Sequence, residues 1–206
     1  MQRTIAYIDG FNLHFGLKSK GWRKYYWLNI HLLIQNLLKQ TQLLIQTKYF
    51  TSLISSPRRN PDKGKRQLTY LEALQTQSSF EIIYGHYLIK PQNCNRCQAR
   101  WTSHEEKMTD VNIAVELLSD AFQDKFDTAL LISADSDLSS PIERVSTLFP
   151  RKRIVIAFPP GRESAHLKKL ASAYFTIGRR NIAKSQFPDK IKKNDGFVLK
   201  RPIQWQ

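Results

Sequence analysis

Short apolar runs alternate with stretches of helical periodicity along the chain. Runs typical of buried strands occupy residues 4–8, 43–53, 128–133 and 153–158. Apolar residues recur at helical spacing over residues 28–40, 67–77, 109–122, 141–148 and 162–174. This alternation of strands and helices predicts an α/β sandwich with a mainly parallel sheet.

The remaining segments give weaker expectations. Residues 81–89 and 175–177 are expected to form strands, and residues 55–66 a basic loop. The segment 91–103, which holds Cys94 and Cys97, is expected to be irregular. Thr109 is expected to cap the helix that follows it. The buried face of that helix is expected to carry Val111, Ala114, Val115, Leu118 and Phe122.

Acidic residues follow the predicted strands. Asp9 comes directly after the first strand, Asp135 and Asp137 follow the strand at 128–133, and Asp110 begins a helix. Ligands of parallel α/β folds bind outside the carboxyl ends of the strands, so the four carboxylates are expected to converge there. Each one alone has another explanation, as a turn residue, a helix cap or a partner of the helix dipole.

The composition favours an anionic partner. The chain has 206 residues, of which 41% are apolar, and it carries 32 Lys and Arg against 17 Asp and Glu, a net charge of +15. This length fits one domain with a real core, and the charge favours nucleic acid as the partner. Every apolar stretch is far shorter than the roughly 18–20 residues that cross a bilayer, so no membrane is expected. Two Cys make no disulfide framework, and we expect a cytoplasmic protein.

Carboxylates packed together repel one another, and a divalent cation offsets that repulsion. Oxygen ligands alone favour Mg²⁺ or Mn²⁺ over zinc. A metal held by carboxylates in a basic protein suggests hydrolysis of phosphodiester bonds. Asn12 lies in the same turn as Asp9, where its amide is placed to hold a ligand or the scissile phosphate.

Three segments resemble the motifs of the NYN domain family, LabA-like members of the PIN-like ribonuclease superfamily. They are AYIDGFNL at 6–13, EKMTDV at 106–111 and LLISADSDL at 130–138. The segment FPPGR at 158–162, followed by Ser164 and Leu167, is similar to a later segment of stand-alone members. The resemblance covers about residues 3–185, and Ala134 stands where the third motif often has Gly.

This resemblance implies a PIN-like three-layer α/β/α sandwich and a metal-dependent endoribonuclease. Asp9, Asp110, Asp135 and Asp137 would form the metal site, with Asn12 in support. The expected domain spans residues 1–187, with an insertion near 91–104, and a basic tail occupies 188–206. PIN-like relatives often pair, so a homodimer is one expectation for the oligomeric state.

Basic and aromatic residues are candidates for RNA binding, because cations contact phosphates and exposed rings stack on unpaired bases. The candidates are Lys18, Lys20, Trp22, Arg23, Lys24, Arg58, Arg59, Lys107, Arg162 and Ser164. Tyr26 and Trp27 have an alternative role in the core, and Ser164 an alternative role as a helix cap. The tail has two alternatives, RNA contact or packing on a partner.

Cys94 and Cys97 have the spacing of half a zinc site, which His104 would help to complete. Two reduced thiols without metal are the alternative. Three functions remain open from the sequence. They are an endoribonuclease, an RNA-binding or scaffold protein that keeps the nuclease fold, and a DNA nuclease of the related flap type.

Overall fold

The computed structural model describes residues 1–54, 56 and 60–206, except for the side chains of 87–90 and 101–106. A six-stranded sheet in the order β3-β2-β1-β6-β7-β8 forms the centre of the molecule, and all of its pairings are parallel. Its strands are β1 (Gln2–Asp9), β2 (Gln42–Thr51), β3 (Phe80–Tyr84), β6 (Thr128–Ile132), β7 (Arg153–Phe158) and β8 (Ala173–Thr176). The strand order reverses between β1 and β6, which is where ligands bind in such sheets.

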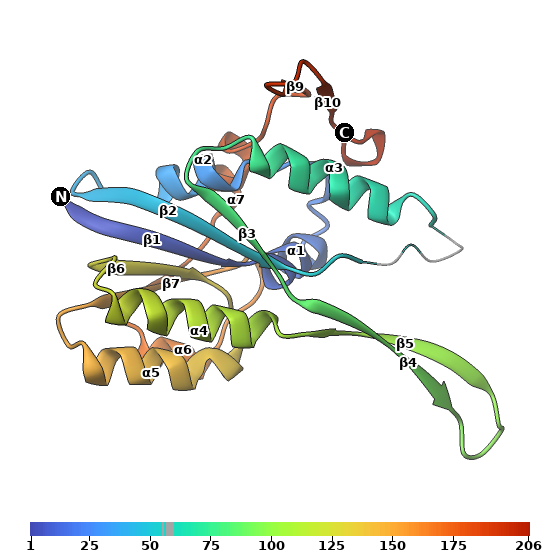
Figure 1. Ribbon diagram of the computed structural model, residues 1–206, viewed down its shortest axis with the longest axis horizontal. Coiled ribbons are helices and arrows are strands. Elements are labelled where there is room, and N and C mark those ends of the chain that lie inside the picture. The colour runs from blue at the N-terminus through green and yellow to red at the C-terminus, as the bar shows by residue number, and fades with distance from the viewer. Residues whose placement is uncertain (55, 57–59) are drawn as a thin grey trace.

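Helices cover both faces of the sheet (Figure 1). One face is covered by α1 (Gly10–Ser19), α2 (Ile30–Leu37), α3 (Lys63–Gln75) and α7 (Arg179–Lys184). The other face is covered by α4 (Thr109–Phe122), α5 (Ser139–Leu148) and α6 (Ala165–Leu170). The predicted three-layer sandwich is therefore confirmed. Among the helices in the described part of the chain, none has the length and apolar character needed to span a membrane.

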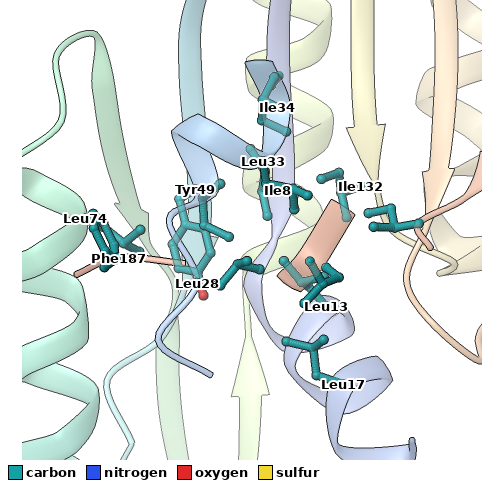
Figure 2. Packing of buried hydrophobic residues seen from close by; sticks show 14 of the residues in the cluster. Ile8, Leu13, Leu17, Leu28, Leu33, Ile34, Tyr49, Leu74, Ile132 and Phe187 are labelled. Atoms are coloured by element: carbon teal, nitrogen blue, oxygen red, sulfur yellow. The ribbon is translucent and has the colours of Figure 1, made fainter. Parts of the chain in front are cut away.

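Both faces of the central strands are buried, which explains their continuous apolar runs. Along β1, Ala6 and Ile8 point into one core, whereas Ile5 and Tyr7 point into the other. Figure 2 shows Ile8 and Ile132 of neighbouring strands beside Leu13 of α1. A strand buried on both sides has no polar face, so its sequence does not alternate.

The prediction for the buried face of α4 was wrong at three of its five positions, whereas Leu118 packs against the core. Val111, Val115 and Phe122 are half exposed or more, and the helix buries Ile113, Leu117, Asp120 and Ala121 instead. The reason is an ion pair that crosses from the sheet. The ammonium group of Lys48 on β2 contacts Asp120 and Glu116, each at 2.5 Å, and this fixes the rotation of the helix.

The strand expected at 81–89 is two strands. β3 ends at Tyr84, and the N–H of Gly85 donates to the Thr51 carbonyl (2.8 Å), where β2 also ends. A Cβ at Gly85 would lie 2.6 Å from the Lys107 carbonyl oxygen, so only glycine fits this crossing. The chain then leaves the sheet as an antiparallel hairpin of β4 (His86–Asn93) and β5 (Arg100–Lys107), which projects from the body (Figure 1). The expectation of irregular structure over 91–103 was therefore wrong.

Some predicted boundaries also shift. α3 begins at Lys63, inside the expected basic loop. Met108, with a φ of 77°, is the cap of α4, so Thr109 is its first helical residue and not its cap. α6 ends at Leu170, before Tyr174, which belongs to β8. These shifts are local, because they move an element end without changing the order of elements.

The end of the chain folds back over the α3 side of the sheet (Figure 1). Two short antiparallel strands, β9 (Lys190–Lys192) and β10 (Val198–Lys200), precede a 3-10 turn, η3 (Ile203–Trp205). The Trp205 ring lies 5.9 Å from the rings of Tyr26 and Tyr70. The basic tail thus contributes to the apolar packing of this face.

Candidate metal centre at the strand ends

Asp9 lies at the carboxyl end of β1, beside the end of β6. Ile8 pairs with Ile132, so Asp9 is level with Ser133. The Asp9 carboxylate is buried, with 4% of the residue exposed, and it caps α1 by accepting the N–H of Asn12 (2.8 Å). Its other oxygen accepts the Ser133 hydroxyl (3.0 Å). Asp9 is therefore held by two elements at once.

The turn after β6 places Asp135 in the same hydrogen-bond network. The hydroxyl oxygen of Ser133 accepts the N–H of Asp135 (3.0 Å), and the Asp135 carboxylate accepts the N–H of Asp137 (3.1 Å). Asn12 joins the two segments, because its side-chain oxygen accepts the N–H of Ala134 (3.2 Å). Ser133 links Asp9 to Asp135 through one hydroxyl group. Ser133 directly precedes the acidic turn, but its local sequence does not mark it as a site residue.

Ala134 fits the position where related motifs often have Gly. Its backbone is not among the positive-φ residues of the described chain. The turn therefore needs no glycine, and the methyl group is accommodated without backbone strain.

Asp110 lies in the first turn of α4. Burial, and then the negative charges of Asp9, Asp135 and Asp137, together raise the pKa of its carboxyl group to about 6. All four carboxylates therefore lie close enough to interact through their charges. We call these four residues the acidic cluster.

The acidic cluster does not form a closed set of ligands in the conformation described. Within residues 1–54, 56 and 60–206, no three Asp, Glu, His or Cys side chains are grouped closely enough to hold one ion. Magnesium commonly keeps several water molecules and takes one or two carboxylates directly. An ion bound in that way needs no closed set of three protein ligands.

The candidate RNA-binding residues occupy different settings. Lys18 and Arg23 line a cavity beside α1. The side chain of Lys20 packs against Gly161, and a Cβ added to this glycine would lie 2.7 Å from Cε of the lysine. The Arg179 guanidinium lies 5.9 Å from the ring centres of both Trp22 and Tyr25, which are 6.2 Å from each other. The ammonium group of Lys24 lies 5.3 Å from the Tyr25 ring.

The other candidates divide as follows. Trp27 is fully buried, as the core alternative predicted, and Tyr26 is half-buried. Lys107 is exposed at the end of β5, just before α4. Ser164 caps α6 by accepting the N–H of Leu167 (3.3 Å), and Arg162 is half-buried two residues before it. Arg58 and Arg59 lie outside the described residues.

Cys94 and Cys97 lie at the tip of the β4–β5 hairpin, and both are free thiols. The N–H of Cys94 donates to the Ala99 carbonyl (2.8 Å), which closes the tip. The side chain of His104, the expected third ligand, lies outside the described part of the chain. Zinc binding at this tip stays a prediction.

Comparisons with known proteins identify a family and similar proteins. The model of the NYN domain family matches residues 3–178. The chain is 28% identical over 176 residues to a 6-hydroxy-3-succinoylpyridine 3-monooxygenase of Pseudomonas putida. That match covers 69% of this chain and 55% of the relative, so the chain spans about half the length of that protein.

A solved structure supports the fold. A Vibrio parahaemolyticus protein of unknown function superposes with a TM-score of 0.55 at 16% identity, covering 86% of this chain and 94% of the other. Identity at this level supports the fold alone.

Proposed function

Because the chain belongs to the NYN domain family, we propose that it is an endoribonuclease that depends on Mg²⁺ or Mn²⁺. The family has a nuclease-type fold, and the acidic cluster supplies the chemistry for the proposal. The observation that carries it is the meeting of four carboxylates from three distant segments at the carboxyl ends of β1 and β6. A protein of net charge +15 that gathers acids at this point is suited to binding a cation against an anionic strand.

The donor set fits a hard cation. All the candidate ligands are carboxylate or amide oxygens, which Mg²⁺ and Mn²⁺ prefer. We assign direct contact to Asp9 and Asp135, which one hydroxyl group already links. Asp110 and Asp137 would act through bound water. Burial, and then the negative charges of Asp9, Asp135 and Asp137, raise the pKa of Asp110, and a cation would offset the repulsion among these charges.

The side chains have distinct roles in the proposed reaction. A bound divalent cation would lower the pKa of water and stabilise charge on the phosphate oxygens. Asn12 uses its side-chain oxygen on Ala134, and its amide N–H₂ has no partner among the described residues, so it would donate to the phosphate. Asp110 would accept a proton from the attacking water. The products would carry a 5′-phosphate and a 3′-hydroxyl.

The name of the Pseudomonas relative points to another reaction class, the addition of oxygen to a pyridine ring. The match covers 55% of that protein at 28% identity, so its activity is not carried over to this chain. The acidic cluster favours phosphodiester hydrolysis, because hard oxygen ligands suit the binding of Mg²⁺ and the activation of water.

The test is a cleavage assay with labelled single-stranded RNA and DNA, in Mg²⁺, Mn²⁺ or EDTA. RNA cleavage that needs metal and is lost in Asp135→Asn would support the proposal. Glu143→Gln is the matched control, because Glu143 is an exposed acid on α5 away from the acidic cluster. RNA binding without cleavage in any metal would instead favour the scaffold alternative, and preferential DNA cleavage would favour the flap-type alternative.

A further inference from the structure

A cavity of about 640 Å³ is lined in part by the first turn of α1, which directly follows Asp9 of the acidic cluster. Its walls come from α1 and α3. Arg23 of the 3-10 turn η1 (Arg23–Tyr25) and Trp205 near the end of the chain complete them. Its volume is in the range of roughly 300–1,000 Å³ that is usual for pockets that bind small ligands. The proposed cleavage mechanism does not use it.

Aromatic rings form one wall of this cavity. The His14 and Tyr26 ring centres are 4.8 Å apart, and the Tyr26 ring lies 5.9 Å from that of Trp205. Tyr70 continues the wall, 5.9 Å from Trp205, and its hydroxyl is satisfied by the Leu28 carbonyl (2.8 Å). Burial, and then the charges of Lys18 and Lys63, lower the pKa of His14 to about 4. The imidazole is therefore neutral near pH 7 and offers a flat, uncharged ring.

Positive charge surrounds the rings. Lys18, Arg23, Lys63 and Arg66 line the cavity, and no Asp or Glu is among the described residues that do so. The Arg66 guanidinium donates to the Asn60 side-chain oxygen (2.7 Å). A ligand that satisfies both features has a planar ring and an attached anion.

The cavity shares a helical turn with the acidic cluster. Gly10 and Phe11 line it, and they directly follow Asp9, which caps α1. A Cβ at Gly10 would lie 2.6 Å from the Tyr49 ring, so the glycine lets this ring close the cavity floor. Figure 2 shows Tyr49 beside Leu28, next to the sheet. If an RNA strand binds with its scissile phosphate at Asp9, a nucleotide next to that phosphate would lie at the cavity.

We propose that this cavity binds one unpaired nucleobase of the RNA strand, stacked on the wall of His14, Tyr26 and Trp205, with its phosphate held by Lys18 and Lys63. This inference rests on the proposed function for the identity of the strand. A paired base cannot enter, because its edge and both faces are already occupied in a duplex. The cavity therefore selects single-stranded or looped RNA for presentation to the acidic cluster.

The test measures nucleotide binding without divalent metal, so that it does not depend on cleavage. The indole N–H resonances of the ¹⁵N-labelled protein are followed by NMR during titration with UMP, with AMP and with ribose 5-phosphate. The Trp205 signal is identified from Trp205→Phe. We expect that signal to shift, with affinity for the nucleotides about tenfold or more above that for ribose 5-phosphate. Equal affinities, or no shift of Trp205, would overturn the inference.

Variants supply a second readout. Tyr26→Leu and Lys63→Ala should each weaken UMP binding, and Lys63→Ala keeps the test valid if the tyrosine variant does not fold, because Lys63 is exposed. Tyr174→Leu and Lys169→Ala are the controls, on exposed residues outside the cavity. Unchanged UMP affinity in both cavity variants would contradict the proposal.

The two proposals fail in different ways. If the wild-type chain never cleaves RNA but UMP still shifts Trp205, the nuclease proposal fails and the cavity stands. If RNA is cleaved, the cavity variants should raise KM and leave kcat unchanged. Cleavage with the same KM in both cavity variants would overturn the cavity proposal and leave the nuclease intact.

Discussion

Ser133 is the residue that couples the two halves of the acidic cluster. Its hydroxyl donates to Asp9 and accepts from the N–H of Asp135, in a position with no exposure to solvent. Ser133→Ala would leave the buried Asp9 oxygen short of a donor. We expect it to lower the free energy of unfolding by about 1–3 kcal/mol, measured by urea denaturation.

The control for that experiment is Ser140→Ala, on an exposed serine of α5. It should change the free energy of unfolding by less than about 0.5 kcal/mol. Equal stability of Ser133→Ala and the wild-type protein would show that the hydroxyl bridge does not hold the two segments together.

His14 and Asp110 give opposite contributions to the pH dependence of stability. The pKa of His14 is about 4 in the folded protein and near 6.5 when unfolded, so between these values the unfolded chain binds more protons. His14 therefore lowers the free energy of unfolding as the pH falls through this window. Asp110, with its pKa raised to about 6, stabilises the folded state as the pH falls toward 4.

The His14→Phe variant isolates the histidine contribution, because the Asp110 contribution is common to both proteins. We expect the variant to gain stability relative to the wild-type protein on moving from about pH 7.5 to about pH 5. Urea denaturation at the two pH values measures this change. A difference in stability that is the same at both values would contradict a buried neutral His14.

At the residue scale, the sequence indicated the acidic residues of the cluster but not the serine that hydrogen-bonds to two of them. Asp9, Asp110, Asp135 and Asp137 were found because they follow apolar runs or begin a helix, which places them at one end of a parallel sheet. Ser133 was not, because its bond to Asp9 joins residues 124 positions apart and depends on strand register. The pairing that brings them together cannot be read from local sequence alone.

At the scale of elements, the buried Lys48 determines how α4 lies on the sheet. Lys48 is 2% exposed, and its ammonium group contacts Glu116 and Asp120, while Asp120 also accepts the Tyr7 hydroxyl (2.8 Å). Burial alone would raise the pKa of Asp120, but the hydrogen bonds from Lys48, Tyr7 and Lys125 lower it. Asp120 therefore stays ionised, and this pair anchors the helix that carries Asp110.

Removing the lysine should be costly, because it leaves a buried carboxylate without its main partner. We expect Lys48→Met to lower the free energy of unfolding by about 3–5 kcal/mol. Lys125→Met is the matched control, since the Lys125 side chain is 46% exposed and its contact with Asp120 is screened by water. The control should change stability by less than about 1 kcal/mol, and equal effects of the two variants would exclude the anchoring role of Lys48.

The same ion pair explains why the buried face of α4 was predicted incorrectly from the sequence. The helix has apolar residues on two sides, and periodicity alone favoured Val111, Val115 and Phe122. The structure buries the side that holds Asp120, because Lys48 and Tyr7 meet it there. The break of the predicted strand 81–89 also depends on a distant contact, because the N–H of Gly85 donates to the Thr51 carbonyl.

At the scale of the whole molecule, the excess of positive charge should govern affinity for RNA. Binding that neutralises phosphates releases counterions, so affinity falls steeply as salt rises. We expect affinity for single-stranded RNA to fall at least about tenfold between roughly 50 and 200 mM salt, measured by fluorescence anisotropy. Lys63→Ala should reduce the slope by about one unit, whereas a flat response in the wild-type protein would exclude an RNA partner.

The overall fold was the most predictable feature, because it depends on sequence patterns that recur several times. Six strands and the helices between them produce the α/β alternation, and an error in one element leaves the rest intact. The path of residues 188–206 was not predictable in this way. Its contact with the core depends on Trp205, whose three neighbours Tyr26, Trp27 and Tyr70 come from distant segments.

The most direct measurement is calorimetric titration of Mn²⁺ into the wild-type protein, Asp9→Asn, Asp135→Asn and Glu143→Gln. If the ends of β1 and β6 jointly hold a cation, the wild-type protein and Glu143→Gln bind Mn²⁺ alike. Each of the other two variants should then bind at least about tenfold more weakly, because one direct carboxylate ligand is lost. Mn²⁺ affinity that is unchanged in both Asp9→Asn and Asp135→Asn, or absent from the wild-type protein, would contradict the proposed centre.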